Sequence, residues 1–134
     1  MAKKILIIDD EQLLLDLLTH LLSKIGYEVD QALDSQEAAG KLKDQTYDAI
    51  FLDMKMPLMD GKAFYSTIKQ QFPELAKRIV FVTGDVANPD TVSFLKGAGN
   101  LHLQKPFTIQ EVKSLLDRFF KSGEAASAVS DTPR

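Results

Sequence analysis

Short apolar segments alternate with longer amphipathic segments along the first 120 residues of the chain. Runs such as Ile5-Leu6-Ile7-Ile8 contain no polar residue, which is typical of a strand buried on both faces of a parallel sheet. The strands that this pattern predicts cover residues 4–8, 28–32, 49–52, 78–82 and 101–103.

The segments between these strands repeat their apolar residues with a period near 3.6, which predicts amphipathic helices. The expected apolar face of the first helix consists of Leu14, Leu18, Leu21 and Ile25. The other four helices are marked by Ala38 with Leu42, Phe64 with Ile68, Val92 with Leu95, and Val112 with Leu115, Leu116 and Phe119.

Capping signals support these helices. Asp34-Ser-Gln-Glu37 and Thr108-Ile-Gln-Glu111 have the spacing of a capping box, and Asn88-Pro89 offers a capping residue followed by proline. Gly26 stands where a glycine often ends a helix. Strands that alternate with helices predict an α/β fold, in which a parallel sheet has helices on both faces.

Composition narrows the class of protein. The chain has 134 residues, which suits one domain, and it has no cysteine, which excludes disulfides and thiolate metal sites. The net charge of −3 argues against direct nucleic-acid binding, and no apolar run is long enough for a membrane span. We therefore expect a cytoplasmic domain over residues 1–122. Residues 123–134 are expected to be a disordered tail or a truncated linker.

Polar residues follow four of the five predicted strands. Asp9 and Asp10 follow the first strand, Asp53 the third, Thr83 the fourth and Lys105 the fifth. Ligands of open α/β sheets bind beyond the carboxyl ends of the strands, so these side chains are expected to share one site. Carboxylates brought so close repel one another, and a hard divalent cation such as Mg²⁺ offsets that repulsion.

Carboxylates with Mg²⁺, a hydroxyl group and a lysine together suit phosphoryl transfer. The chain contains neither glycine-rich nucleotide motif, GxxxxGK[ST] or GxGxxG. The phosphoryl acceptor is therefore expected to be one of the chain's own carboxylates, because aspartate can form an acyl phosphate.

Four motifs in order carry a resemblance to a known family. They are Ile7-Ile-Asp9-Asp10-Glu11, Phe51-Leu-Asp53-Met-Lys-Met-Pro57-Leu-Met-Asp-Gly61, Phe81-Val-Thr83-Gly84 and Leu103-Gln-Lys105-Pro106-Phe107. Over residues 4–120 the chain resembles the receiver domains of two-component response regulators, including the chemotaxis regulators. The resemblance implies a doubly wound (βα)5 three-layer sandwich with the flavodoxin-like strand order 2-1-3-4-5.

The resemblance also implies a role for each matching residue. Asp53 would be the phosphoacceptor. Mg²⁺ would be held by Asp10 directly, by Asp9, by Asp53 and by the backbone carbonyl of Lys55. Further implied roles are phosphoryl contacts by Thr83, Gly84 and Lys105, a cis bond between Lys105 and Pro106, and a loop shaped by Pro57 and Gly61.

Two places depart from the commonest family pattern. His102 stands where the family often has tyrosine or phenylalanine, a ring that switches together with Thr83, and His102 is either such a switch or a plain strand residue. Gly97-Ala-Gly-Asn100 is similar to receivers fused to hybrid sensor histidine kinases. Lys55 and Asp85, which flank the expected phosphoryl group, are expected to tune its lifetime.

The function that follows is a phosphorylation-operated switch: a phosphoacceptor regulatory domain, not an enzyme, that assists its own phosphotransfer and autodephosphorylation. A sensor histidine kinase or a histidine phosphotransfer protein would supply the phosphoryl group. The response would reach the surface over residues 91–121, and the downstream effector stays unknown. One alternative is a phosphorylation-independent docking or dimerisation domain. The other is a Mg²⁺-dependent aspartyl-phosphate phosphatase, which Lys55 argues against because such enzymes commonly carry an acid at that position.

Overall fold

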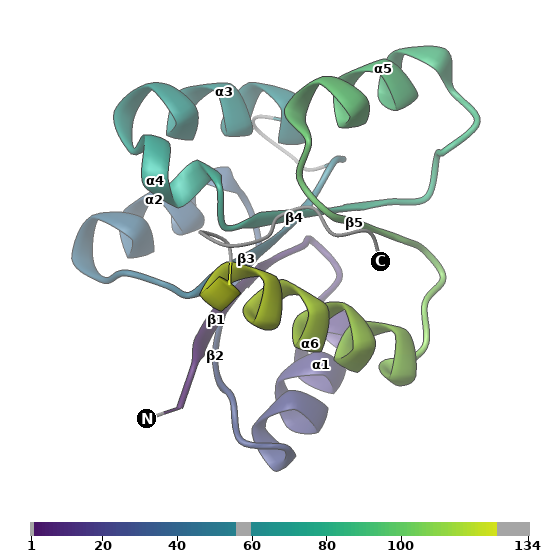
Figure 1. Ribbon diagram of the computed structural model, residues 1–134. Helices are drawn as coiled ribbons and strands as arrows, with labels where there is room; N and C mark the ends of the chain where they lie inside the picture. Colours follow the sequence, from purple (N-terminus) through teal and green to yellow (C-terminus); the bar gives the residue numbers. More distant parts are fainter. Residues whose placement is uncertain (1, 56–59, 126–134) are drawn as a thin grey trace.

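A parallel sheet of five strands forms the centre of the molecule (Figure 1). The computed structural model describes residues 2–55 and 60–125. The strands are β1 (Lys4–Ile8), β2 (Glu28–Ala32), β3 (Ala49–Asp53), β4 (Ile79–Thr83) and β5 (His102–Gln104). Their order is β2-β1-β3-β4-β5, so the predicted topology is confirmed and each strand lies within one residue of its expected bounds.

Helices cover both faces of the sheet, which gives the three layers expected (Figure 1). On one face lie α1 (Gln12–Lys24) and α6 (Ile109–Ala125). The other face carries α2 (Ser35–Asp44), α3 (Gly61–Gln71), α4 (Pro73–Ala76) and α5 (Pro89–Ala98). The single turn α4 was not predicted. Helix α6 ends at Ala125, past the expected domain boundary at 122, and residues 126–134 lie outside the described part of the chain.

The predicted caps are present at three helix starts. Asp34 accepts a hydrogen bond from the backbone N–H of Glu37 at 2.8 Å, and Asn88 accepts one from the N–H of Asp90 at 2.8 Å. Thr108 and Glu111 accept reciprocally from each other's backbone N–H groups, at 3.1 and 2.8 Å. These bonds satisfy helix N–H groups that have no partner within the helix.

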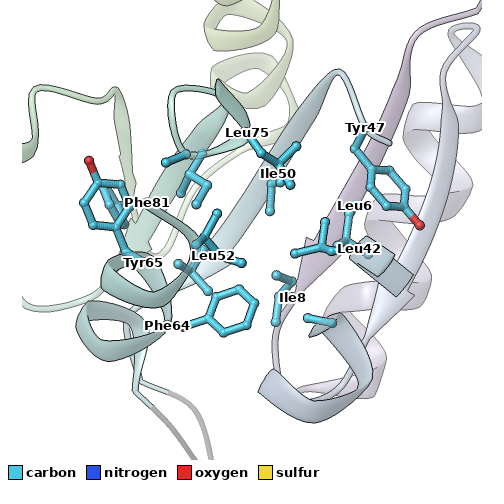
Figure 2. Packing of buried hydrophobic residues seen from close by; sticks show 14 of the residues in the cluster. Leu6, Ile8, Leu42, Tyr47, Ile50, Leu52, Phe64, Tyr65, Leu75 and Phe81 are labelled. Carbon is cyan, nitrogen blue, oxygen red and sulfur yellow. The ribbon is translucent and has the colours of Figure 1, made fainter. Parts of the chain in front are cut away.

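Two hydrophobic cores lie on the two faces of the sheet. The core beneath α2, α3, α4 and α5 is drawn in Figure 2, where Leu6, Ile50 and Phe81 from three strands face the helices. The second core lies beneath α1 and α6 and includes Val112 and Leu116. Strands β3 and β4 are buried along their whole length, which explains why they are apolar without alternation.

The expected apolar face of α1 was right at Leu18 and displaced by one position on either side of it. The helix buries Leu15, Leu18 and Leu22 rather than the stripe through Leu14 and Leu21, and Ile25 is exposed. The segment is rich in leucine all round, so its periodicity allows more than one stripe. Packing against the sheet selects the stripe that is buried.

The Gly97–Asn100 segment has a structural role in the approach to β5. Gly99 ends α5 with φ +77°, a backbone conformation that favours glycine. The amide of Asn100 then donates to the carbonyl oxygens of Ala76 and Ile79, at 3.0 and 2.7 Å. These bonds fasten the start of β5 to the start of β4. No helix in the described residues is long and apolar enough to cross a membrane.

Candidate phosphoryl-transfer site

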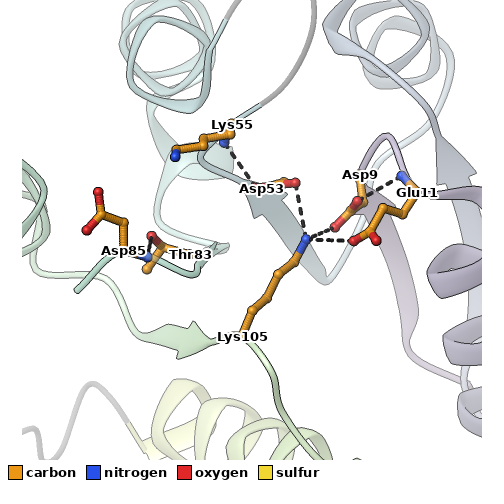
Figure 3. A network of polar contacts seen from close by, with 7 residues as sticks. All are labelled: Asp9, Glu11, Asp53, Lys55, Thr83, Asp85 and Lys105. Atoms are coloured by element: carbon orange, nitrogen blue, oxygen red, sulfur yellow. Dashed lines mark hydrogen bonds and ion pairs between the residues drawn. The ribbon is translucent and has the colours of Figure 1, made fainter. Parts of the chain in front are cut away.

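The predicted site residues meet at the carboxyl ends of four strands (Figure 3). Asp53 is the last residue of β3 and Thr83 the last of β4, while Asp9 follows β1 and Lys105 follows β5. Because β3 lies between β1 and β4, Asp53 has the acids of β1 on one side and Thr83 on the other. The rule that ligands bind at this edge of an open sheet therefore predicted the location.

Three carboxylates form a cluster suited to a metal ion. Asp9, Asp10 and Asp53 each offer one oxygen, and these oxygens lie within 4.8 Å of one another. Asp9 and Asp53 are only 3% and 6% exposed, whereas Asp10 is exposed. An all-oxygen donor set with this charge fits a hard divalent cation such as Mg²⁺.

Lys105 supplies the positive charge of the site. Its ammonium lies 2.9 Å from Oδ2 of Asp9, 3.2 Å from Oε1 of Glu11 and 3.4 Å from Oδ2 of Asp53 (Figure 3). Burial lowers the pKa of Lys105, but the hydrogen bond from its ammonium to Asp9 and the charge of Asp53 outweigh burial and raise it overall. Lys105 is therefore firmly protonated in the described site.

Backbone N–H groups hold the other polar oxygens in place. The N–H of Lys55 donates to Oδ1 of Asp53 at 3.0 Å, and the N–H of Asp85 donates to the hydroxyl oxygen of Thr83 at 3.0 Å. Asp9 accepts in the same way from the N–H of Glu11, at 3.0 Å. Each bond comes from the residue two positions on, so the turn after each strand orients the side chain that ends or follows it.

The electrostatics of Asp53 reflect its burial. Burial raises the pKa of Asp53 above its ordinary value of 3.8, and the charge of Asp9 raises it further. The hydrogen bond from the Lys55 N–H and the charge of Lys105 oppose this, but the net direction is upward. A carboxylate in this setting is destabilised when ionised, and a further cation beside it would relieve that cost.

Gly61 brings the start of α3 against the acceptor strand. A Cβ atom at Gly61 would lie 2.7 Å from the Cα of Met54 and 2.9 Å from the backbone oxygen of Asp53. The Gly61 N–H donates to the Met54 oxygen at 2.9 Å, and Asp60 caps α3 by accepting from the N–H of Ala63 at 3.0 Å. The close approach requires glycine at position 61. Pro57, the other residue predicted to shape this loop, lies outside the described residues.

The remaining predicted residues surround the site, except His102, which is the first residue of β5 and lies away from the strand ends that form the site. Gly84 is exposed and follows Thr83, and the Lys105–Pro106 bond is cis, as expected. His102 is exposed on β5, where Phe81 of β4 is its register partner. Lys55 is exposed and Asp85 half-buried. The Lys55 side chain extends away from Lys105 to the side where Asp85 lies (Figure 3), although no ion pair joins the two within the described residues.

One contact of the site was missed by sequence reasoning. Glu11 contacts Lys105 from the start of α1, although the two residues are 94 positions apart in the chain. The only signal was its place directly after two aspartates. The conformation of a side chain that is 63% exposed is not encoded in any local pattern.

Comparison with known proteins decides the family. The model of the response regulator receiver domain matches residues 5–117. The chain belongs to this family. It is therefore a receiver domain of two-component signalling, a class of phosphorylation-operated regulatory switches, and such domains take their phosphoryl group from histidine kinases. Receiver domains bind Mg²⁺ in an acidic site, and the Asp9, Asp10 and Asp53 cluster fits this property.

Two curated relatives illustrate the range of the family. The receiver is 32% identical to the alkaline phosphatase synthesis transcriptional regulatory protein PhoP of Bacillus subtilis, over 98% of this chain and 54% of that protein. It is 30% identical to hybrid signal transduction histidine kinase L of Dictyostelium discoideum, over 92% of this chain and 8% of that protein. The chain thus spans about half or less of the length of these relatives. Both transcriptional regulators and hybrid kinases match, so similarity to the hybrid-kinase type stays a prediction.

Solved structures agree on the fold. The chemotaxis protein CheY4 of Vibrio cholerae superposes with a TM-score of 0.79 at 29% identity, covering 89% of this chain and 99% of that one. The receiver domain of a Pseudomonas aeruginosa sensor histidine kinase gives a TM-score of 0.79 at 28% identity, covering 91% and 100%. That structure has a magnesium ion coordinated in its active-site cleft.

Proposed function

We propose that this receiver accepts a phosphoryl group on Asp53 from a phosphohistidine of a histidine kinase or a histidine phosphotransfer protein. The observation that carries the proposal is the setting of Asp53. Its carboxylate is buried, contacts Lys105, belongs to the acidic cluster and lies on the strand next to Thr83. No other residue of the cluster combines these features. Asp10 is exposed, and Asp9 follows β1, which is not a neighbour of β4 in the sheet.

The transfer exchanges one bond to phosphorus for another. An oxygen of Asp53 attacks the phosphorus atom, the P–N bond to the donor histidine breaks, and the imidazole keeps the electron pair and takes up a proton. The product is an acyl phosphate on Asp53. Hydrolysis ends the signal. Water attacks the phosphorus atom, the P–O bond to Asp53 breaks, and inorganic phosphate leaves while the carboxylate is restored.

The residues of the site have distinct parts in this step. Asp9, Asp10, Asp53 and the backbone carbonyl of Lys55 are the proposed holders of Mg²⁺, which supplies charge neutralisation for the phosphoryl oxygens when bound. Lys105 donates to a phosphoryl oxygen as a point charge. The Thr83 hydroxyl and the Gly84 backbone N–H, both on the β4 side of the site, are the proposed donors to another phosphoryl oxygen.

The proposed output lies on the surface over residues 91–121, which contains most of α5 together with β5 and most of α6. A phosphoryl group adds about 1.5–2 negative charges next to Thr83. Movement of the Thr83 hydroxyl toward that charge would free space beside β4. We propose that the side chain of His102 on β5 then moves into this space. A two-state change of this kind couples the site to the surface.

The alternatives are weaker. A phosphatase is disfavoured by family membership and by Lys55 at the position of the usual second acid. A docking domain that acts without phosphorylation would not need Lys105 in contact with two buried aspartates.

The test is incubation with Mg²⁺ and acetyl phosphate, followed by intact mass measurement. We expect a gain of one phosphoryl group that is labile to hydroxylamine, and none in Asp53→Asn. Turnover of acetyl phosphate without accumulation would favour a phosphatase. An unchanged mass with no turnover would favour the docking domain.

A further inference from the structure

We propose that Glu11 is a positioning residue that holds Lys105 in the unphosphorylated receiver and competes with the phosphoryl group for it. The inference rests on the proposed function, because it assumes that a phosphoryl oxygen on Asp53 becomes a partner of Lys105. Glu11 ends the first of the four motifs, but the resemblance assigns it no role in the reaction. The argument comes from the three contacts of one ammonium group.

Three carboxylates surround the single ammonium group of Lys105 in the structure. An ammonium group has three N–H donors. Three carboxylates lie around it, those of Asp9, Glu11 and Asp53, at 2.9, 3.2 and 3.4 Å (Figure 3). A phosphoryl oxygen that binds Lys105 therefore competes with these three carboxylates for the ammonium.

Glu11 is the carboxylate best able to leave. Asp9 is buried, and its other oxygen is held by the Glu11 backbone N–H at 3.0 Å. Asp53 is itself the acceptor, with its other oxygen held by the Lys55 N–H. The Glu11 side chain is 63% exposed, and in the described part of the chain its carboxylate makes no other hydrogen bond. Its charge is readily solvated by water once it leaves.

The presence of Glu11 then opposes phosphoryl binding in two ways. Its contact with Lys105 competes with the phosphoryl group, and its negative charge stays close to a group that carries about two negative charges. The same negative charge favours a cation in the acidic cluster, because opposite charges attract at this range. Removal of the charge is therefore expected to strengthen phosphoryl binding and to leave Mg²⁺ binding equal or weaker. Loss of a merely structural residue would not strengthen phosphoryl binding while leaving Mg²⁺ binding equal or weaker.

The test compares the wild-type chain with Glu11→Gln, which keeps the shape and removes the charge. Amide NMR titrations measure the affinity for beryllofluoride, a phosphoryl mimic, at saturating Mg²⁺, and the affinity for Mg²⁺ alone. We expect beryllofluoride to bind about two- to fivefold more tightly to Glu11→Gln, the range for a partly exposed ion pair, with Mg²⁺ binding unchanged or weaker. The control is Glu28→Gln, which makes the same charge change at the start of β2, the opposite end of the sheet.

The outcomes separate this inference from the proposed function. Equal or weaker beryllofluoride binding in Glu11→Gln, with normal binding in the wild type, overturns the role of Glu11 alone. An equal gain in Glu28→Gln also overturns it, since the effect would then come from net charge. Failure of the wild type both to bind beryllofluoride and to accept phosphate from acetyl phosphate overturns the proposed function, and the inference with it.

Discussion

Asp53, the proposed phosphoacceptor, is buried at a cost to the stability of the fold. The carboxyl group is buried at the end of β3, and burial raises its pKa above 3.8. The folded chain therefore binds this proton more tightly than the unfolded chain does. Ionised Asp53 thus destabilises the fold: the penalty is absent below about pH 4 and develops as the pH rises through the raised pKa.

We expect Asp53→Asn to raise the melting temperature at pH 7 in the absence of divalent cations. Asparagine removes the buried charge, can still accept from the Lys55 N–H, and leaves Lys105 paired with Asp9 and Glu11. Each 1 kcal/mol of relief corresponds to about 3–5 °C for a domain of this size. Thermal melts from pH 4 to pH 8 are the measurement. The gain should shrink toward pH 4, and a gain independent of pH would argue against a raised pKa at Asp53.

Lys55 and Asp85 are predicted to affect how long the phosphoryl group lasts on Asp53. They lie two positions after Asp53 and Thr83, and their charges are opposite. In the described structure they form no ion pair, so a bridge between them is predicted only for the phosphorylated state. Such a bridge would hinder the water that must approach in line with the P–O bond.

Lys55→Ala and Asp85→Ala are each expected to speed the loss of phosphate by about two- to fivefold, or roughly 0.4–1 kcal/mol of barrier. The double variant should add little to either single variant, because both break one contact. Dephosphorylation is followed by intact mass after removal of acetyl phosphate, with Lys69→Ala, an exposed lysine of α3, as the control. Unchanged or slower loss in both single variants would leave Lys55 with its backbone role alone.

At the scale of elements, the contact between α3 and the end of β3 depends on Gly61. Gly61→Ala would place a methyl group against the backbone of Asp53 and Met54, which cannot move aside as a flexible side chain can. We expect the free energy of unfolding to fall by about 1–3 kcal/mol in urea denaturation and phosphorylation of Asp53 to slow. Gly40→Ala is the matched control, since Gly40 lies within α2 with no atom within 4 Å of a Cβ. This change should stabilise by about 0.5–1 kcal/mol, and similar effects at both glycines would contradict the steric argument.

Elements differ in how much of them the sequence predicts. All five strands were predicted within one residue. For β1, β3 and β4 the reason is that a strand buried on both faces is apolar almost throughout. Caps such as Thr108 with Glu111 mark helix starts. The buried face of α1 was predicted less well, because the leucines around Leu15 lie on several sides of the helix and more than one apolar face fits the sequence. The turn α4 is four residues long, too short for periodicity. The rule that ligands bind beyond the carboxyl ends of the strands predicted that Asp9, Asp53 and Lys105 lie together. The contact of Glu11 with Lys105 depends on a side-chain conformation, which that rule does not predict.

For the whole molecule, the site is a property of the folded sheet. Asp10 and Asp53 are 43 positions apart in the chain and meet only because β1 and β3 are neighbours. An unfolded chain does not hold these carboxylates together, so a cation that binds the cluster binds the native state preferentially. Any such ligand stabilises the entire domain by mass action.

Mg²⁺ is therefore expected to raise the melting temperature of the wild-type receiver. At ten times its dissociation constant the stabilisation is about 1.4 kcal/mol, or about 5 °C for a domain of this size. Asp10→Asn should lose most of this shift, because it removes one of the three clustered carboxylates. The measurement is a series of thermal melts at increasing MgCl2, each matched by NaCl of equal ionic strength to exclude screening. An equal shift in the wild type and in Asp10→Asn would place the magnesium away from the acidic cluster, and the proposed metal ligands would then be wrong.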